Sequence, residues 1–494
     1  LICLAVFLIY APSLFSGFVW LDHKQVEEGS LIARNYRELT EGFTSPLQSK
    51  RDTYYRPLVK ASLSIDYQVF KLNPFGYHLS NILLHILNSL LIFLILVNLT
   101  SNQEIAFLAT MLWATHPIGV FVVSWISARA DLLFSLFLLF SFYCYLKFKE
   151  NSSRFLFFYS LSGFIFSLMS KETAVVYPLL LMAYEMEPAR AKGRLSLLPY
   201  FIITTLYLYL KIGVTQRLGS GVSLLYGQPR LVFFTMSAAI LDYLKKIVFP
   251  INLSMSDAFI KFDYLNHVAA ASLSGIALLF FVAFKKMRKD YLPLFFLLWF
   301  FILLIPASNI LPAKHFRAER FIYLPMLGII YFLTRLLYKD GLRKFFILAI
   351  ALFCCINLIR QLDFKDDLKL FTRALKVEPQ TKEAYEMLGL YYLERGQPQK
   401  AWGYYQLALK PESRYFSFVD TFGVYNNLGV ISMRFNSLPK AIDYFKKALS
   451  IRDEALAHLN LYLCYKKLGD LPQAEKHLAI AINQDPGLAE KHSR

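Results

Sequence analysis

Long apolar stretches separated by short polar ones fill the chain up to about residue 360. The stretches lie near residues 1–16, 78–99, 105–122, 131–147, 155–170, 173–187, 195–213, 231–249, 267–284, 291–306, 320–338 and 344–360. Runs of about 15 to 20 apolar residues are long enough to cross the hydrocarbon core of a bilayer as α-helices. The pattern predicts an all-α, polytopic membrane domain over residues 1–360.

The stretch at 231–249 differs from the others, because it carries Asp242, Lys245 and Lys246 near its end. We expect this stretch to be interfacial or re-entrant, since charged side chains are costly inside the hydrocarbon core. With this helix set aside, the pattern predicts about eleven spans.

Short clusters of Lys and Arg set the predicted orientation, because cytoplasmic loops are enriched in basic residues. The clusters lie at residues 147–154, 190–194, 285–289 and 335–344. If all of them face the cytoplasm, the N-terminus is inside. The long first loop at residues 17–77 and the region after residue 360 are then extracytoplasmic.

After about residue 360 the pattern becomes that of a soluble helical array with an internal repeat. Segments beginning at Leu388, Leu428 and Leu461 align, as LGLYYLERGQPQKAWGYYQLAL, LGVISMRFNSLPKAIDYFKKAL and LYLCYKKLGDLPQAEKHLAIAI. In each segment a Gly or Asn that ends one helix precedes a closely packed Ala: Gly396 and Ala401, Asn436 and Ala441, Gly469 and Ala474.

The unequal offsets between these segments predict a short insertion near residues 414–421, and residues 366–379 resemble the second helix of a degenerate preceding unit. The pattern predicts a tetratricopeptide-like α-solenoid over residues 361–494. Such arrays bind peptides or partner domains on a concave face.

Composition supports a membrane protein, with 56% hydrophobic and only 18% charged residues. The net charge of +18 fits basic cytoplasmic loops and anionic partners. No basic stripe with interleaved aromatic residues marks a nucleic-acid surface. The five cysteines show no CxxC spacing, so neither a disulfide framework nor a zinc site is indicated. We propose no obligatory metal from the sequence.

The first loop combines an acid, Asp22, with an arginine in an aromatic setting, Arg56. A carboxylate and a guanidinium at the membrane surface suit a reaction on a lipid-linked phosphate, with the acid as base and the arginine on the phosphate. The predicted topology gathers further ionisable residues on the same side: His116, Arg129, Asp131, Lys171, Glu172, Glu319 and Arg320.

Several strings recur in order along the membrane part. They are WLDHKQVEEG, YYRPL with GYHLSNILLHILNSLL, THPIGVFVVSWISARADLL, SKETAVVYPLLLMAYE, and PASNILP with AERFIYLPMLG. Followed by tetratricopeptide repeats, this order resembles the transmembrane O-mannosyltransferase (TMTC-like) family and its bacterial relatives. The resemblance extends over almost the whole chain and implies a glycosyltransferase of the GT-C fold.

The resemblance implies that a sugar such as mannose moves from a polyprenyl-phosphate donor, dolichyl- or undecaprenyl-linked, to a protein Ser or Thr hydroxyl. Inverting displacement requires a base near the acceptor and cations on the departing phosphate. Carried over by position, Asp22 is the implied base. The implied phosphate ligands are Arg56, Arg129, Lys171 and Arg320. The implied sugar-binding or orienting residues are His116, Asp131, Glu172 and Glu319.

Two positions depart from the family pattern. Leu21 stands where the family often has a first Asp, and Phe121 stands where a Glu usually follows the His-Pro pair. These departures motivate an alternative, a catalytically decayed membrane scaffold that binds proteins through its repeats. A transporter is a third hypothesis. Transporters bind substrate near the middle of the membrane, whereas most ionisable residues of this chain lie at the ends of the predicted spans.

The expected partners are membrane lipid, the polyprenyl-phosphate sugar and a protein acceptor recruited by the repeats. The short array favours a bacterial inner membrane with a periplasmic repeat domain, and the endoplasmic reticulum membrane is the alternative.

Overall fold

The protein is described by a computed structural model over residues 1–47, 54–187, 194–216, 228–255, 258–287, 290–309, 315–411 and 414–485. The chain forms two compact units. Unit 1 comprises residues 1–255 and 259–370, and unit 2 comprises residues 256–258 and 371–494. The predicted domain boundary at residues 360/361 stays a prediction; α15 ends at Gln361, and unit 1 ends at Leu370.

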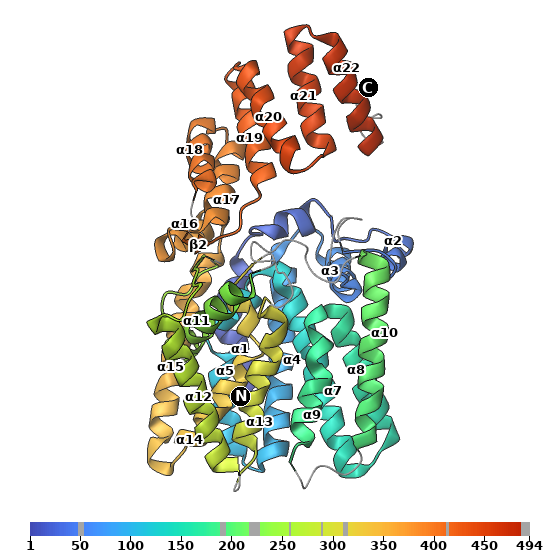
Figure 1. The fold of residues 1–494 in the computed structure, drawn as a ribbon. Coiled ribbons are helices and arrows are strands. Elements are labelled where there is room, and N and C mark those ends of the chain that lie inside the picture. Colours follow the sequence, from blue (N-terminus) through green and yellow to red (C-terminus); the bar gives the residue numbers. More distant parts are fainter. Residues whose placement is uncertain are drawn as a thin grey trace. The chain divides into compact units, whose positions relative to one another are not determined.

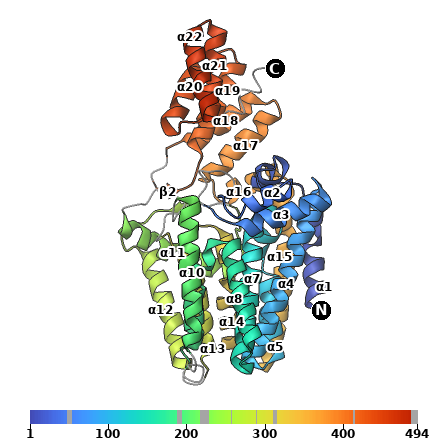
Figure 2. The ribbon, with the colours of Figure 1, turned by 90° about the vertical axis from the view of Figure 1, so that its right-hand side faces the viewer.

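Unit 1 is a bundle whose helices run up and down between two ends (Figure 1, Figure 2). Its α-helices are α1 (Ile2–Tyr10), α2 (Tyr36–Glu41), α3 (Pro57–Phe70), α4 (Pro74–Thr100), α5 (Gln103–Ala114), α6 (Ile118–Val123), α7 (Arg129–Asn151), α8 (Arg154–Ser170), α9 (Tyr177–Glu185), α10 (Leu198–Thr215), α11 (Pro229–Val248), α12 (His267–Met287), α13 (Leu292–Leu304), α14 (Met326–Leu337) and α15 (Arg343–Gln361). The helix α16 (Asp367–Val377) follows.

Short helices lie between the α-helices of unit 1, where the longer helices begin or end. They are η1 (Ala11–Phe15), η2 (His23–Glu27), η3 (Ile126–Ala128), η4 (Glu172–Val176), η6 (Arg194–Leu197), η7 (Ile305–Ala307), η8 (Glu319–Ile322), η9 (Asp340–Leu342) and η10 (Leu362–Phe364). The strands in the described residues are β1 (Phe259–Ile260) and β2 (Tyr415–Phe416). The prediction of an all-α fold is confirmed.

Five helices in the described residues are long and apolar enough to cross a membrane. They cover Pro74–Thr100, Ile126–Asn151, Leu195–Thr215, His267–Met287 and Arg343–Phe364. Shorter apolar helices cover Ile2–Phe15, Arg154–Ser170, Leu292–Ala307 and Met326–Leu337. The chain is a membrane protein, while the count of about eleven spans stays a prediction.

One expected continuous run is interrupted in the structure. The stretch near 105–122 is divided into α5 and α6, and the break contains His116 and Pro117. The helix turns here because proline has no backbone N–H to donate to the preceding turn.

The end of unit 1 at which α2 and α3 lie is here called the loop end (Figure 1). The helix α7 begins at this end and α8 returns to it, which places the α8–η4 junction beside the first turn of α7. The basic residues around the α7–α8 and α14–α15 turns lie at the opposite end (Figure 1). Arg190, Lys192, Arg288 and Lys289 of the other two clusters lie outside the described residues.

The helix α11 is not among the five candidate spans. The hydroxyl of Thr235, near its start, accepts the backbone N–H of Phe262 at 2.9 Å, just before α12. Near its end, Lys246 donates to Glu319 of η8 at 3.1 Å. Both ends of α11 therefore contact the loop end. This geometry supports the expectation that α11 is an interfacial or re-entrant helix and does not cross the membrane.

Unit 2 consists of helix pairs: α17 (Lys382–Glu394) with α18 (Pro398–Leu409), α19 (Thr421–Arg434) with α20 (Leu438–Ile451), and α21 (Ala455–Leu468) with α22 (Leu471–Gln484). Gly396, Asn436 and Gly469 have positive φ angles and follow the first helix of each pair, as predicted. The predicted insertion lies between α18 and α19, where the chain contains β2.

Small residues let the two helices of a pair approach closely. Ala401 and Ala441 are fully buried. A Cβ atom added at Gly429 would stand 2.4 Å from Cε1 of Phe445, so only glycine fits against this ring. The sequence repeat thus translates into a regular packing of pairs.

Candidate active site

The structure brings Arg56, Asp131, Lys171, Glu172 and Arg320 together at the loop end. Each lies where a helix begins or breaks. Arg56 immediately precedes Pro57 and α3, Asp131 is in the first turn of α7, and Lys171 is extended between α8 and η4. Glu172 and Arg320 lie at the starts of η4 and η8. These short breaks turn charged side chains inward from different parts of the chain.

Arg56 and Glu172 form a two-pronged ion pair. Nε of Arg56 donates to Oε2 at 2.9 Å, and Nη2 donates to Oε1 at 2.6 Å. The guanidinium also lies 4.3 Å from the centre of the Tyr54 ring, a cation–π contact. Burial raises the pKa of Glu172, but the attraction of Arg56 outweighs burial and lowers this pKa to about 2. The pair is charged and rigid at neutral pH.

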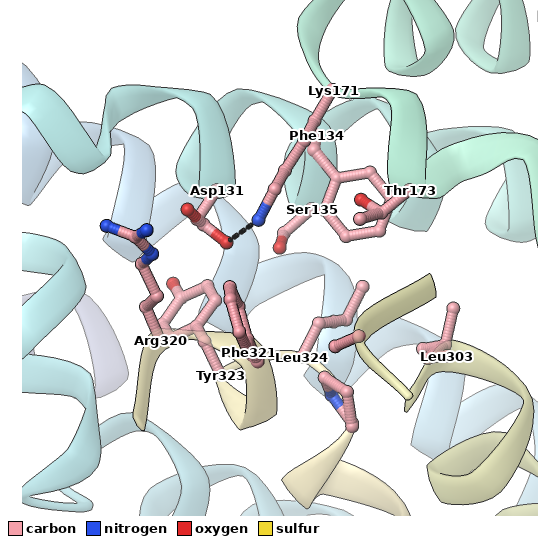
Figure 3. Close-up of a pocket in the computed structure, with 12 residues that line it drawn as sticks. Asp131, Phe134, Ser135, Lys171, Thr173, Leu303, Arg320, Phe321, Tyr323 and Leu324 are labelled. Atoms are coloured by element: carbon pink, nitrogen blue, oxygen red, sulfur yellow. Dashed lines mark hydrogen bonds and ion pairs between the residues drawn. The ribbon is translucent and has the colours of Figure 1, made fainter. Parts of the chain in front are cut away.

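Asp131 and Lys171 form a second ion pair, with Nζ 2.5 Å from Oδ1. The pair lines a cavity of ≈ 20 Å³, together with Ser135, Thr173 and Arg320 (Figure 3). The remaining lining is apolar and aromatic, from α7, α13, η7, η8 and the segment after η8. Burial lowers the pKa of Lys171, and the neighbouring Arg56 and Arg320 lower it further.

The guanidinium of Arg320 has no hydrogen bond or ion pair to another described residue. Its guanidinium carbon lies 5.3 Å from the centre of the Trp125 ring and 5.5 Å from that of Phe321. Trp125 in turn stacks on Trp20, with ring centres 4.4 Å apart. Because aromatic faces attract a cation without satisfying its N–H donors, Arg320 is held in place while its donors remain available to an anion.

Asp22 is fully buried, two residues after the Trp20 that stacks on Trp125. Its carboxylate accepts the backbone N–H of Val19 at 3.2 Å, the backbone N–H of Ser127 at 2.8 Å and the Ser127 hydroxyl. Burial raises the pKa of Asp22 to about 7, although these hydrogen bonds oppose the rise. Asp22 ties the first loop to η3, and its pKa lies in the range that suits a base at neutral pH.

The first loop is also tied to the end of the membrane unit. The backbone N–H of Gly17 donates to the carbonyl of Lys365 at 3.1 Å. The carboxylate of Asp367 accepts the backbone N–H of Trp20 at 2.8 Å and lies 2.9 Å from Nε2 of His23. Trp20 has φ +55°, which is uncommon for a bulky residue and needs such support.

Arg129 is placed differently from the phosphate contact that the resemblance implies. It is fully buried, and it donates to Asp66 at 2.7 Å, to Ser62 at 2.8 Å and to the carbonyl of Tyr77 at 3.0 Å. It also donates to Asn81. With its donors committed to α3 and α4, Arg129 holds the start of α7 in place, and this geometry favours a structural role.

His116 and Glu319 are similarly enclosed. Nε2 of His116 donates to the carbonyl of Ile247 at 3.0 Å, and its Nδ1 accepts the backbone N–H of Ile118 at 3.2 Å. Glu319 accepts hydrogen bonds from Lys246 and Arg360. Both residues connect helices around the site, and their predicted role as sugar-binding or orienting residues stays a prediction.

Sequence reasoning missed Lys211, Ser135 and Thr173. Lys211 is buried in α10 and acts electrostatically on Arg56 and Glu172. A lysine within an apolar span is itself a signal of function, which could have identified it. Serine and threonine in apolar helices give no such signal.

Cations outnumber carboxylates among the described residues of the cluster, and Lys171 and Arg320 both line the cavity. In the described part of the chain, the cations are Arg56, Lys171, Lys211 and Arg320, and the carboxylates that act on them are Asp131 and Glu172. An excess of positive charge with limited solvent exposure attracts a phosphate group. Among the described residues, no group of three or more His, Cys, Asp or Glu side chains could hold a metal ion.

The sequence of this chain is similar to those of protein O-mannosyl-transferases. The chain is 32% identical over 152 residues to protein O-mannosyl-transferase TMTC3 of Homo sapiens, covering 29% of this chain and 16% of TMTC3. It is 39% identical over 93 residues to TMTC2 of Mus musculus, covering 19% of this chain and 11% of TMTC2. These matches confirm the resemblance expected from the ordered strings. They span less than a fifth of either relative's length.

A family model of the tetratricopeptide repeat matches residues 357–415, which confirms the predicted repeat. Among solved structures, the chain resembles ArnT from Cupriavidus metallidurans bound to undecaprenyl phosphate, with a TM-score of 0.44 and 12% identity. The alignment covers 82% of this chain and 75% of ArnT. A TM-score at this level carries no argument about the site.

Proposed function

We propose that the chain is an integral-membrane glycosyltransferase of the GT-C type. It moves a mannose-like sugar from a polyprenyl-phosphate donor to a Ser or Thr hydroxyl of a protein, and the repeats recruit that protein. The observation that carries this proposal is the cluster of cations around the Asp131–Lys171 cavity at the loop end. Similarity to protein O-mannosyl-transferases supports the choice of sugar and acceptor.

In this proposal the donor phosphate binds Arg320 and Lys171. Arg320 is held by aromatic faces with its donors free of other described residues, and Lys171 is released from Asp131 when the anion arrives. Arg56 and Lys211, which both act electrostatically on Glu172, add positive charge. As the bond between sugar and phosphate breaks, these cations stabilise the growing charge on the departing phosphate.

Asp22 is the proposed base. A hydroxyl, that of Ser127, already donates to its carboxylate, and the acceptor hydroxyl would take this place. A pKa of about 7 lets Asp22 accept the proton at neutral pH without remaining permanently protonated. Asp131 and Glu172 orient Lys171 and Arg56.

The proposed orientation places the loop end on the extracytoplasmic side. The bacterial inner membrane with a periplasmic repeat domain is favoured, and the endoplasmic reticulum is the alternative. The basic residues at the opposite end of the bundle support this orientation, because cytoplasmic loops are enriched in Lys and Arg.

The test is a transfer assay with purified full-length protein in liposomes. Radiolabelled polyprenyl-phosphate sugars are offered together with extracytoplasmic proteins of the host. We expect label to move to protein with the native chain and not with Asp22→Asn. The matched control is Asp290→Asn, which changes an acid paired with Arg335 at the opposite end of the bundle and should preserve transfer.

A second function, a decayed transferase that acts as a scaffold, is favoured by Phe121. This residue is buried against Trp125 and Phe364, with ring centres 5.4 Å and 5.7 Å apart. Its aromatic setting leaves no place for the carboxylate that the family often has there. Absence of transfer from every donor, with a partner still captured by the repeats, would support the scaffold and refute the transferase.

A further inference from the structure

We propose that the hydroxyls of Ser135 and Thr173 form a phosphate-binding pair inside the cavity at the loop end. The inference rests on the proposed function and extends it to residues that neither the sequence strings nor the ion pairs single out. Both side chains line the cavity with Lys171 and Arg320 (Figure 3). The ligand is a phosphate monoester or diester, which is the head group of a polyprenyl-phosphate donor or product.

Ser135 lacks the backbone hydrogen bond that several other buried hydroxyls on this chain make. Ser89, Thr115 and Ser170 each donate to the backbone carbonyl four residues earlier, at 2.8 Å. Ser135 is fully buried, yet its hydroxyl has no hydrogen-bond partner among the described residues. A buried hydroxyl without a partner lowers stability, so its position facing the cavity needs a compensating role.

Thr173 repeats this feature on a second element. It lies in η4, two residues after Lys171, and its Oγ1 is inaccessible and unpartnered within the described part of the chain. Ser135 lies one helical turn after Asp131, so both side chains point from the same face of α7. The two hydroxyls and the Asp131–Lys171 pair therefore surround the same small space.

The chemistry of this lining matches an oxyanion better than a sugar ring. Ser135, Thr173, Lys171 and Arg320 all offer hydrogen-bond donors, and phosphate oxygens only accept. The carboxylate of Asp131 repels an anion, but the neighbouring cations Arg56, Lys171 and Arg320 outnumber it. Lys171 and Arg320 offer donors only, and their positive charges favour an anion over a neutral sugar ring.

The cavity is so small that side chains must move before a phosphate group can bind in it. A volume of ≈ 20 Å³ holds about one water molecule, which is too small for a phosphate group. The anion can enter only when the Lys171 ammonium leaves Asp131, whereupon the ammonium binds the phosphate and the hydroxyls complete its coordination. The Asp131–Lys171 bond thus closes the site when no donor is bound.

The experiment measures lipid binding by the full-length protein in nanodiscs, with and without two substitutions. Ser135→Ala and Thr173→Val each remove a hydroxyl with little change of shape. The matched control is Thr110→Val, because Thr110 is fully buried on α5 and its hydroxyl also lacks a partner among the described residues, but it does not line the cavity. The probes are undecaprenyl phosphate, the corresponding polyprenol without phosphate, and inorganic phosphate as competitor.

We expect Ser135→Ala and Thr173→Val each to weaken undecaprenyl phosphate binding about tenfold, whereas Thr110→Val leaves binding unchanged. Without ligand, all three variants should melt at or above the native temperature, since each removes an unsatisfied buried group. Competition by inorganic phosphate would identify the phosphate itself as the recognised group. Binding of the lipid without such competition would still support the pair if the variants weaken it.

Two results would overturn the proposal and are distinguishable. If the native chain binds undecaprenyl phosphate and both cavity variants bind it equally well, the hydroxyl pair is wrong while the proposed function stands. If the native chain binds neither the phosphate lipid nor inorganic phosphate, both the pair and the proposed function are wrong. Equal binding of the polyprenol without phosphate would also refute the pair.

Discussion

Replacing Arg129 with Met tests whether this arginine supports the loop end or binds a donor. Its guanidinium is fully buried and donates to Asp66, Ser62, Asn81 and the carbonyl of Tyr77. Methionine fills similar space but leaves the Asp66 carboxylate buried without its cation. Removing one partner of a buried ion pair costs about 3–5 kcal/mol, so Arg129→Met should strongly destabilise unit 1.

The assay is thermal unfolding of the purified full chain in detergent. For a unit of this size, extrapolation of the usual scaling gives roughly 1–2 °C per kcal/mol. We therefore expect the Tm to fall by on the order of 5 °C. Arg154→Met is the matched control, because Arg154 is exposed at the start of α8, and its Tm should stay within about 1 °C of the native value.

A double variant separates the ion pair from general loss of packing. Arg129→Met combined with Asp66→Leu removes both charges, and it should recover much of the lost stability, since a buried pair and an apolar replacement are often similar in free energy. An unchanged Tm in Arg129→Met with loss of lipid-phosphate binding would refute this reasoning and would establish Arg129 as a phosphate ligand.

Two further predictions concern Asp22 and the repeats. The pKa of Asp22 is raised from 3.8 to about 7, so between these pH values the folded chain retains a proton that the unfolded chain releases, and stability falls as pH rises. A pH series of thermal unfolding should show this decline in the native chain and a flatter profile in Asp22→Asn; parallel profiles would contradict it. In the repeats, a Cβ at Gly429 would stand 2.4 Å from the Phe445 ring, whereas one at Gly403 would meet nothing within 4 Å. Urea unfolding followed on unit 2 should show Gly429→Ala destabilised by about 1–3 kcal/mol and Gly403→Ala stabilised by about 0.5–1 kcal/mol; equal effects would refute the packing argument.

Much of the fold could be predicted from the sequence, because periodic signals act locally. The repeat illustrates this, since Gly396, Asn436 and Gly469 fall at the same place in each unit and all have positive φ angles. The interruption at Pro117 is equally local. The number of spans is harder, because α11 has the length of a span but contacts the loop end from both of its ends.

The site was predicted as a set of residues, but not as a set of contacts. Arg56 and Glu172 are separated by 116 residues, and nothing in either sequence neighbourhood specifies the partner. For the same reason, the sequence could not reveal that the donors of Arg129 are committed to α3 and α4 while those of Arg320 are not. Whether the hydrogen-bond donors of a charged side chain are occupied by neighbouring groups depends on packing between elements that are distant in the sequence.

The bonds between residues 13–20 and residues 361–367 have a consequence for biosynthesis. Ser13 donates its backbone N–H to Gln361, and Trp20 donates its own to Asp367, across separations of 348 and 347 residues. Translation at about 5–20 residues per second implies that the loop waits roughly 20–70 s for these anchors. The loop that carries Asp22 is therefore made long before the residues that anchor it, and a chain that stops before Asp367 lacks the carboxylate that Trp20 and His23 contact.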